Sequence, residues 1–140
     1  MSTKKKILVI DDEPDAIRFV SAVLSEFESY TVIPAGEGKE GMKKAEDIHP
    51  DLIILDVMLP DIDGFELFYE LQRQESTRDI PVIMLTGVAE KYGIHFSGKD
   101  MKGYMGKEPV DYIEKPMDPE RILASVKHVL GESSKAGEAG

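Results

Sequence analysis

The sequence contains no cysteine, and its three histidines are widely separated. The absence of cysteine excludes disulfides, thiol nucleophiles and thiolate metal sites, and it is compatible with a reducing compartment. His49, His95 and His128 lie in segments of different character, so no spacing supports a histidine zinc cluster. Any metal held by this chain is therefore expected to have oxygen or imidazole ligands.

Long apolar runs and positive charge are also scarce. No run approaches the roughly 18 apolar residues that would suggest a membrane span. After the basic start Lys4–Lys6, the apolar stretch Ile7–Ile10 ends at Asp11, which is too short for a signal peptide. We therefore expect a cytoplasmic protein. The formal net charge of −10 repels phosphate backbones, so nucleic acid is not expected as a direct partner.

Short apolar runs, by contrast, recur along the chain. The 140 residues, 41% of them hydrophobic, suffice for one ordinary core and are too few for two full-sized domains. Runs of apolar and β-branched residues are typical of strands buried on both faces of a parallel sheet. Five such strands are predicted: Ile7–Ile10, Tyr30–Ile33, Leu52–Leu55, Val82–Leu85 and Val110–Ile113.

Apolar residues at helical spacing lie between and after these strands. Pro14 stands where the first turn of the first helix would begin. The predicted helices are Pro14–Phe27, Lys39–Ile48, Phe65–Leu71 and Arg121–Leu130. Because parallel neighbouring strands need crossover connections, this alternation predicts a doubly wound α/β fold with helices on both faces of the sheet.

Two segments do not fit this alternation. Gly87–Glu108 should hold one helix, but its glycines disfavour a continuous one, and we expect an irregular segment or a broken helix. The polar stretch 132–140 has nothing to bury and is predicted to be a disordered tail. Residues 4–131 are then expected to form one domain.

Polar residues gather where the predicted strands end. Asp11, Asp12 and Glu13 follow the first strand, Asp56 the third, Thr86 the fourth and Lys115 the fifth. The carboxyl ends of parallel strands meet at one edge of the sheet, where ligands bind in such folds.

Carboxylates brought together at this edge would repel one another unless a cation compensates them. Oxygen ligands without sulfur favour a hard ion such as Mg²⁺, for which Mn²⁺ could substitute. With a hydroxyl from Thr86 and an ammonium from Lys115, the set describes a site for a phosphoryl group, and Asp56 is best placed as its nucleophile. The alternative is that Asp11, Asp12 and Asp56 are solvated loop carboxylates.

The same residues stand in motifs that resemble the receiver domains of bacterial response regulators. The resemblance extends to about Leu130, and the joint order of its motifs is highly specific. They are Ile7–Glu13, Asp51–Pro60, Asp63–Gly64, Pro81–Thr86 and Asp111–Pro116. It implies a single receiver domain of the chemotaxis-receiver type, with a flavodoxin-like fold and strand order 2-1-3-4-5.

By that resemblance, Asp56 would accept a phosphoryl group from a sensor histidine kinase or a histidine phosphotransfer protein. Asp12, Asp56 and the backbone carbonyl of Met58 would bind Mg²⁺, and Asp11 would act through a water molecule. Lys115 would pair with phosphoryl oxygens. Such a domain is a switch of a two-component phosphorelay, not an enzyme with a substrate of its own, since it catalyses only its own phosphorylation and dephosphorylation.

The signal would then reach a protein-binding face. Thr86 would move to hydrogen-bond a phosphoryl oxygen, Tyr112 would follow inward, and the Lys115–Pro116 peptide bond would be cis. Tyr112 could equally be packed near the strand end without any role as a switch. No output domain fits this length, so output would pass through an unknown downstream protein. Aromatic and methionine residues within Gly87–Glu108 could form a partner or homodimer surface, or pack beneath a longer loop.

Two other motifs compete with this interpretation. Gly36–Gly41 matches a dinucleotide-binding glycine pattern, but Glu37 and Glu40 would oppose a pyrophosphate. The pattern also follows the second predicted strand, whereas dinucleotide-binding domains carry it after the first. Asp61–Gly64 resembles the acidic motif of haloacid-dehalogenase-type phosphatases, but those enzymes carry it directly after the first strand. A scaffold with this fold and no phosphorylation is a third possibility, and the intact Asp, Thr and Lys set argues against it.

Overall fold

The computed structural model of the protein describes residues 4–27, 29–87 and 109–131. Nine elements alternate along them: β1 (Lys5–Ile10), α1 (Pro14–Leu24), β2 (Tyr30–Ala35), α2 (Gly38–Ile48), β3 (Leu52–Asp56), α3 (Gly64–Arg73), β4 (Val82–Thr86), β5 (Asp111–Glu114) and α6 (Pro119–Leu130). The segments 88–108 and 132–140 lie outside the described residues. The predictions for the glycine-rich segment and for the tail therefore stay predictions.

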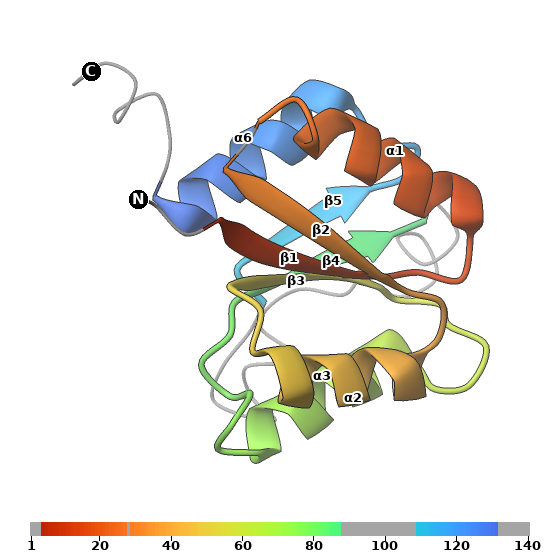
Figure 1. Ribbon diagram of the computed structural model, residues 1–140. Helices are drawn as coiled ribbons and strands as arrows, with labels where there is room; N and C mark the ends of the chain where they lie inside the picture. Colours follow the sequence, from red (N-terminus) through yellow and green to blue (C-terminus); the bar gives the residue numbers. More distant parts are fainter. Residues whose placement is uncertain (1–3, 28, 88–108, 132–140) are drawn as a thin grey trace.

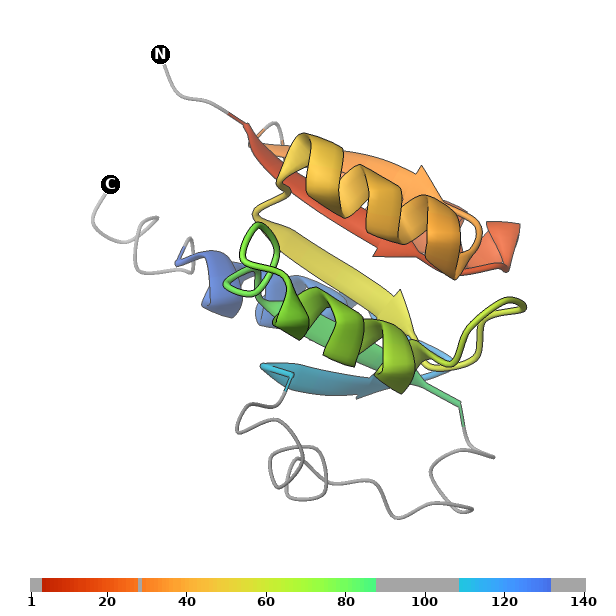
Figure 2. The ribbon, with the colours of Figure 1, turned by 90° about the horizontal axis from the view of Figure 1, so that it is seen from below.

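The strands form one parallel sheet in the order β2-β1-β3-β4-β5. Helices α1 and α6 cover one face and α2 and α3 the other (Figures 1 and 2). The predicted doubly wound α/β fold and its strand order are thus confirmed. The winding direction changes between β1 and β3, so the loops after these two strands diverge to opposite faces and leave a crevice at the carboxyl edge.

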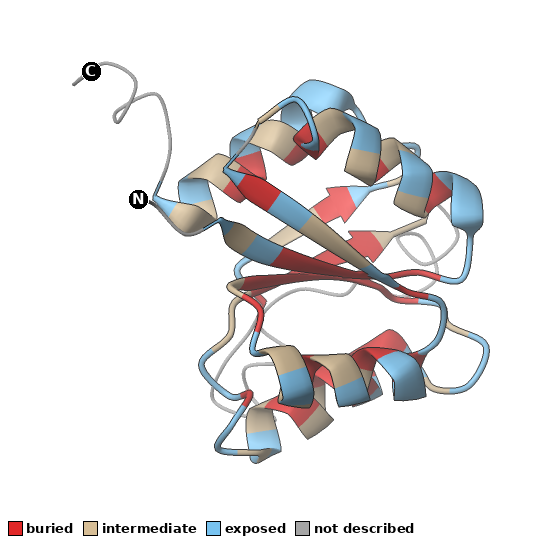
Figure 3. Ribbon diagram, viewed as in Figure 1, coloured by how far each residue is buried: buried red, intermediate tan, exposed pale blue. Residues whose placement is uncertain are grey.

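Alternation along the strands divides the core into two layers. Ile7, Val9 and Leu52 belong to the layer under α1 and α6, whereas Leu8 and Ile10 belong to the layer under α2 and α3. All of these side chains are fully buried, and the central strand β3 is buried throughout its length (Figure 3). Burial on both faces explains why the strands are continuous apolar runs and not alternating ones.

Helix ends follow local sequence signals. Pro14 and Pro119 occupy the first turns of α1 and α6, where the missing N–H is not needed. The Asp63 carboxylate accepts a hydrogen bond from the Phe65 backbone N–H at 2.7 Å and so caps α3. Gly131 ends α6 with a φ of 72°, a backbone conformation that glycine adopts without strain.

Two predicted elements extended too far, and the others were predicted one or more residues too short. Helix α1 ends at Leu24, because the chain turns at Ser25 to reach β2, and Phe27 lies beyond the helix. Phe27 still packs against the same apolar layer, 6.0 Å from the Tyr30 ring centroid. Val110 precedes β5 instead of belonging to it, and its side chain is 52% exposed.

The edge strand β2 contains Pro34, which pairs with Val9 of β1. The Lys44 ammonium of α2 donates a hydrogen bond to the Pro34 carbonyl oxygen.

Among the described residues, no helix is long and apolar enough to cross a membrane.

The glycine pattern Gly36–Gly41 has a packing role in this fold. A Cβ atom on Gly41 would lie 2.4 Å from Ile10 Cδ1, and one on Gly38 would lie 2.1 Å from Ile62 Cγ2. These glycines therefore let α2 approach its neighbours closely. The Glu40 carboxylate accepts a hydrogen bond from the Gly36 N–H at 2.9 Å, which places negative charge where a pyrophosphate would have to bind.

Candidate functional site

The polar residues predicted to converge do so at the carboxyl edge of the sheet, the end to which the arrowheads point in Figure 1. Asp11 directly follows β1, Asp56 ends β3, Thr86 ends β4 and Lys115 directly follows β5. The Lys115 backbone N–H donates to the Thr86 carbonyl oxygen at 2.7 Å, so the last two positions are joined directly. Neighbouring parallel strands in register thus place four distant sequence positions side by side.

Three carboxylates form the acidic part of the site. Asp11, Asp12 and Asp56 each offer an oxygen atom, and these oxygens lie within 4.8 Å of one another. Asp11 is fully buried and Asp56 is 4% exposed, whereas Asp12 is exposed to solvent. The Asp11 Oδ1 atom accepts from the Glu13 backbone N–H at 3.0 Å. The loop after β1 is thereby folded so that the Asp11 side chain faces the site.

Lys115 supplies positive charge to the same site. Its ammonium nitrogen lies 3.0 Å from Asp11 Oδ2, 2.9 Å from Glu13 Oε1 and 3.3 Å from Asp56 Oδ2. Burial alone would lower the pKa of Lys115, but the close contacts with the Glu13 and Asp11 carboxylates and the charge of Asp56 raise this pKa above its usual value. The Lys115 side chain therefore stays charged. The Lys115–Pro116 peptide bond is cis, as predicted.

One ammonium does not compensate the acids around it. Burial, and then the charge of Asp11, raise the pKa of Asp56 from 3.8 to about 7, although Lys115 opposes both effects. The Asp11 Oδ2 atom is buried without a hydrogen bond of good geometry, and its contact with Lys115 is an ion pair only. An excess of buried negative charge around a single ammonium fits a divalent cation that prefers oxygen ligands. Asp11, Asp12 and Asp56 are thus compatible with a metal site.

The carboxylates open onto a hollow of about 310 Å³ lined by Asp12, Glu13, Asp56, Met58, Gly87 and Lys115. Met58 stands at its rim with 61% of its surface exposed. The Met58 backbone N–H lies 3.4 Å from Asp56 Oδ1, a long hydrogen bond. Asp56 therefore lines a hollow whose volume suffices for a small anionic group.

The two predicted switch residues lie near the hollow but do not line it. Thr86 is half-buried at the end of β4. Tyr112 is half-buried in β5 and packs against the apolar layer under α2 and α3. The structure therefore brings together Asp11, Asp12, Asp56 and Lys115, with Thr86 beside them, and places Tyr112 farther from this edge of the sheet, in the first half of β5.

Sequence reasoning noted Glu13 only as part of the acidic run and gave it no partner. Its contact with Lys115 joins the loop after β1 to the loop after β5, and it depends on side-chain conformations that sequence spacing does not specify. The adjacency of Glu13 to the two aspartates was the one available signal. The haloacid-dehalogenase-like motif Asp61–Gly64 lies in the loop between β3 and α3, not directly after β1.

Comparison with known proteins agrees with this geometry. The sequence model of the response regulator receiver domain matches residues 7–127. The alkaline phosphatase synthesis transcriptional regulatory protein PhoP of Bacillus subtilis is 40% identical over 132 residues, which cover 94% of this chain and 51% of PhoP. The DNA-binding dual master transcriptional regulator RpaA of Synechocystis is 39% identical over 137 residues, which cover 96% of this chain and 52% of RpaA. This chain therefore spans about half the length of these curated relatives.

Solved structures show the same fold over nearly the whole of both chains. A CheY-like response regulator receiver domain protein from Methanospirillum hungatei superposes with a TM-score of 0.76 and 30% identity, covering 96% of this chain and 99% of that one. The chemotaxis response regulator CheY4 of Vibrio cholerae gives a TM-score of 0.75 and 28% identity, covering 91% of this chain and 100% of that one. With its sheet order, its acidic edge and these matches, this chain belongs to the response regulator receiver domain family.

Proposed function

We propose that Asp56 is the phosphoryl acceptor of this receiver domain and that a divalent cation, Mg²⁺ or in its place Mn²⁺, assists the transfer. The observation that carries the proposal is the position of Asp56. It is a nearly buried carboxylate at the end of a central strand, 3.3 Å from the Lys115 ammonium and within 4.8 Å of two further carboxylates. A structural ion pair would need neither the extra acids nor the opening to solvent.

In the transfer, an Asp56 carboxylate oxygen forms a bond to phosphorus in line with the bond that breaks. The donor nitrogen of a phosphohistidine, or the donor oxygen of acetyl phosphate, leaves with the electron pair of that bond. Asp56 must be ionised to attack, and its pKa of about 7 means that compensation of the site's charge favours the reactive form. The bound cation would supply that compensation and neutralise phosphoryl oxygens.

The remaining residues hold and orient the groups. Asp12, Asp56 and the backbone carbonyl of Met58 would bind the cation, and Asp11 would hold it through a water molecule. Lys115, already charged and within reach of Asp56, would pair with a phosphoryl oxygen. The reaction is confined to the domain's own carboxylate, so this is not an enzyme with an external substrate, and its self-catalysed dephosphorylation belongs to the same proposal.

Thr86 and Tyr112 would carry the change outward. Thr86 lies at the end of β4, the strand beside β3, and its hydroxyl would hydrogen-bond a phosphoryl group on Asp56; Tyr112 on the neighbouring strand would follow. The donor would be a sensor histidine kinase or a histidine phosphotransfer protein. The receiver of the signal would be a downstream protein, with homodimerisation as a possible step and no direct contact with nucleic acid. The cytoplasmic location expected from the sequence is part of this proposal.

Intact mass spectrometry tests the acceptor. The protein is incubated with Mg²⁺ and acetyl phosphate or phosphoramidate, beside Asp56→Asn and a sample with chelator. We expect a phosphoryl adduct on the natural chain alone and only with metal. If no adduct forms on the folded protein, binding of beryllofluoride distinguishes rapid hydrolysis, in which the complex still forms, from a scaffold without phosphorylation, in which it does not.

A further inference from the structure

The loop 57–63 carries a proposed metal ligand that lies outside the sheet, the backbone carbonyl of Met58. Asp56 ends the buried strand β3, and Asp11 directly follows the buried end of β1 and donates its backbone N–H to the Ala35 carbonyl oxygen at 3.0 Å, so both positions follow from the core. Met58 lies beyond the end of β3, and its side chain is 61% exposed and adds little packing. The position of the Met58 carbonyl therefore depends on what holds the loop.

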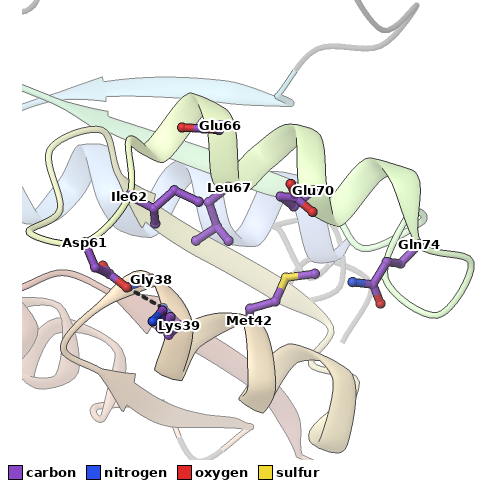
Figure 4. A pocket seen from close by; sticks show the side chains of 9 residues that line it. All are labelled: Gly38, Lys39, Met42, Asp61, Ile62, Glu66, Leu67, Glu70 and Gln74. Carbon is purple, nitrogen blue, oxygen red and sulfur yellow. Dashed lines mark hydrogen bonds between the residues drawn. The ribbon is translucent and has the colours of Figure 1, made fainter.

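The base of this loop is closed by backbone contacts. The Val57 N–H donates to the Leu85 carbonyl at 3.0 Å, and the Gly64 N–H donates to the Val57 carbonyl at 2.8 Å. Met58 and Asp63 form an isolated antiparallel bridge. These contacts define where the loop leaves and rejoins the fold, but the tip, which contains Asp61, extends past them toward α2 (Figure 4).

At the tip, the Asp61 carboxylate binds the N-terminus of α2. Its Oδ1 atom accepts from the Gly38 N–H at 2.7 Å, and its Oδ2 atom accepts from the Lys39 N–H at 2.9 Å (Figure 4). The residue at the N-cap of α2, Glu37, makes no capping hydrogen bond with its own side chain. The first N–H groups of a helix need acceptors, and α2 obtains two of them from a loop more than twenty residues later in the chain.

The contact is close because position 38 is glycine. A Cβ atom there would lie 2.1 Å from Ile62 Cγ2 and 3.2 Å from Asp61 Oδ1. Beside it, Ile62, Met42 and Leu67 line a groove of about 400 Å³ between α2 and α3 (Figure 4). Ile62 also packs against the core layer on this face. The tip is thus held by two charged hydrogen bonds and by apolar packing next to them.

We propose that Asp61 is a positioning residue of the metal site. By fixing the loop tip to α2, it holds the Met58 backbone where its carbonyl can serve the cation bound by Asp12 and Asp56. The inference rests on the proposed function, because it requires that a divalent cation binds at these residues. Groups that orient metal ligands typically change metal affinity by about 10- to 100-fold when they are removed.

Titration with Mn²⁺, followed by the electron paramagnetic resonance signal of the free ion, measures the affinity without any reaction. For Asp61→Ala we expect a dissociation constant about tenfold higher than for the natural chain, the low end of that range, because Asp61 acts through the backbone. Glu66→Ala is the matched control. Glu66 is an exposed acid in the same groove, but it does not hold the loop 57–63. We expect its removal to change the dissociation constant by less than about twofold, since exposed charges are screened.

Two further variants separate positioning from charge and from folding. Gly38→Ala keeps every charge but forces Ile62 and Asp61 away from α2, and it should weaken Mn²⁺ binding as well. Asp61→Asn keeps one acceptor oxygen and should recover part of the affinity lost in Asp61→Ala. With acetyl phosphate, Asp61→Ala should need more Mg²⁺ to reach half of its maximal rate and should approach the natural rate at saturating Mg²⁺.

The outcomes distinguish this inference from the proposed function. If the natural chain binds Mn²⁺ and is phosphorylated while Asp61→Ala binds like Glu66→Ala, the positioning role is wrong and the function stands. If the natural chain neither binds Mn²⁺ nor forms the adduct, the function fails first. Circular dichroism monitors folding. If Asp61→Ala does not fold, Gly38→Ala and Asp61→Asn decide, and unchanged affinity in both overturns the inference.

Discussion

The charge of Asp56 should make the metal-free protein less stable than a variant that lacks this charge. The pKa of Asp56 is raised from 3.8 to about 7 by burial and by Asp11. Below 3.8 the carboxyl is protonated in both the folded and the unfolded chain and has no effect. Between 3.8 and 7 only the folded chain keeps the proton, so the free energy of unfolding decreases as the pH rises. Above 7 the decrease is complete.

Three pKa units correspond to about 4 kcal/mol, which is the upper limit of the effect. In Asp56→Asn the side chain keeps its shape and the acceptor that faces the Met58 N–H, and Lys115 keeps its contacts with Asp11 and Glu13. We therefore expect Asp56→Asn to be more stable than the natural chain by about 2 to 4 kcal/mol at pH 8 in the presence of chelator. The gain should shrink as the pH falls from 7 toward 4.

Urea unfolding in chelator, at several pH values, measures the difference. Mg²⁺ should then stabilise the natural chain and have little effect on Asp56→Asn, because ligand binding stabilises only the form that binds it. Glu66→Gln, which removes an exposed charge, should behave like the natural chain. Equal stability of the natural chain and Asp56→Asn at pH 8, or a gain that does not depend on pH, would refute the reasoning that burial opposes the charge of Asp56.

Substitutions at three further positions test contacts that stabilise the fold around the site and beside it. Gly64→Ala should lower the free energy of unfolding by about 1 to 3 kcal/mol and slow phosphorylation by acetyl phosphate, because its Cβ would lie 2.4 Å from the Asp56 backbone carbonyl; unchanged urea unfolding would contradict this. Asp63→Ala should cost about 1 kcal/mol through loss of the α3 cap, measured by thermal unfolding, whereas Asp63→Asn should retain most of the stability. Arg121→Ala should raise the pKa of Asp111, because the two hydrogen bonds from Arg121, at 2.9 Å each, are the main cause that lowers it; NMR titration of the Asp111 carboxyl carbon checks this, and an unchanged pKa would show that the pair does not persist in solution.

The sheet could be predicted because its signal is local. A run such as Ile7–Ile10 has one good location, a strand covered on both faces, and the strand indeed lies there. The strand begins at Lys5, because Lys5 and Lys6 pair with Tyr30 and Thr31 through backbone groups that are the same in every residue. Because Lys5 and Lys6 are charged, the apolar pattern of the sequence does not indicate that they belong to the strand.

The convergence of the acidic residues, Thr86 and Lys115 could be predicted because each of them ends or follows a strand, and parallel strands bring their ends together. The contacts that hold the site could not. The role of Asp61 as a cap of α2 and the pairing of Glu13 with Lys115 both join segments that sequence places far apart, through side-chain geometry that exists only in the folded chain. The acids of Asp61–Gly64, which resemble the haloacid-dehalogenase motif, cap helices in this fold. Asp61 caps α2 and Asp63 caps α3.

The edge strand β2 limits how another polypeptide can join this sheet. An exposed strand edge is a template for strand addition, and proline interrupts it because it has no N–H to donate. At Pro34 the carbonyl oxygen is also occupied, by the Lys44 ammonium. At Pro34 an incoming strand would find neither an N–H donor nor a free carbonyl acceptor. Edge-to-edge pairing of another strand with β2 is therefore disfavoured. We therefore expect a protein that binds this side of the domain to contact side chains of the neighbouring helices instead of adding a strand to the sheet.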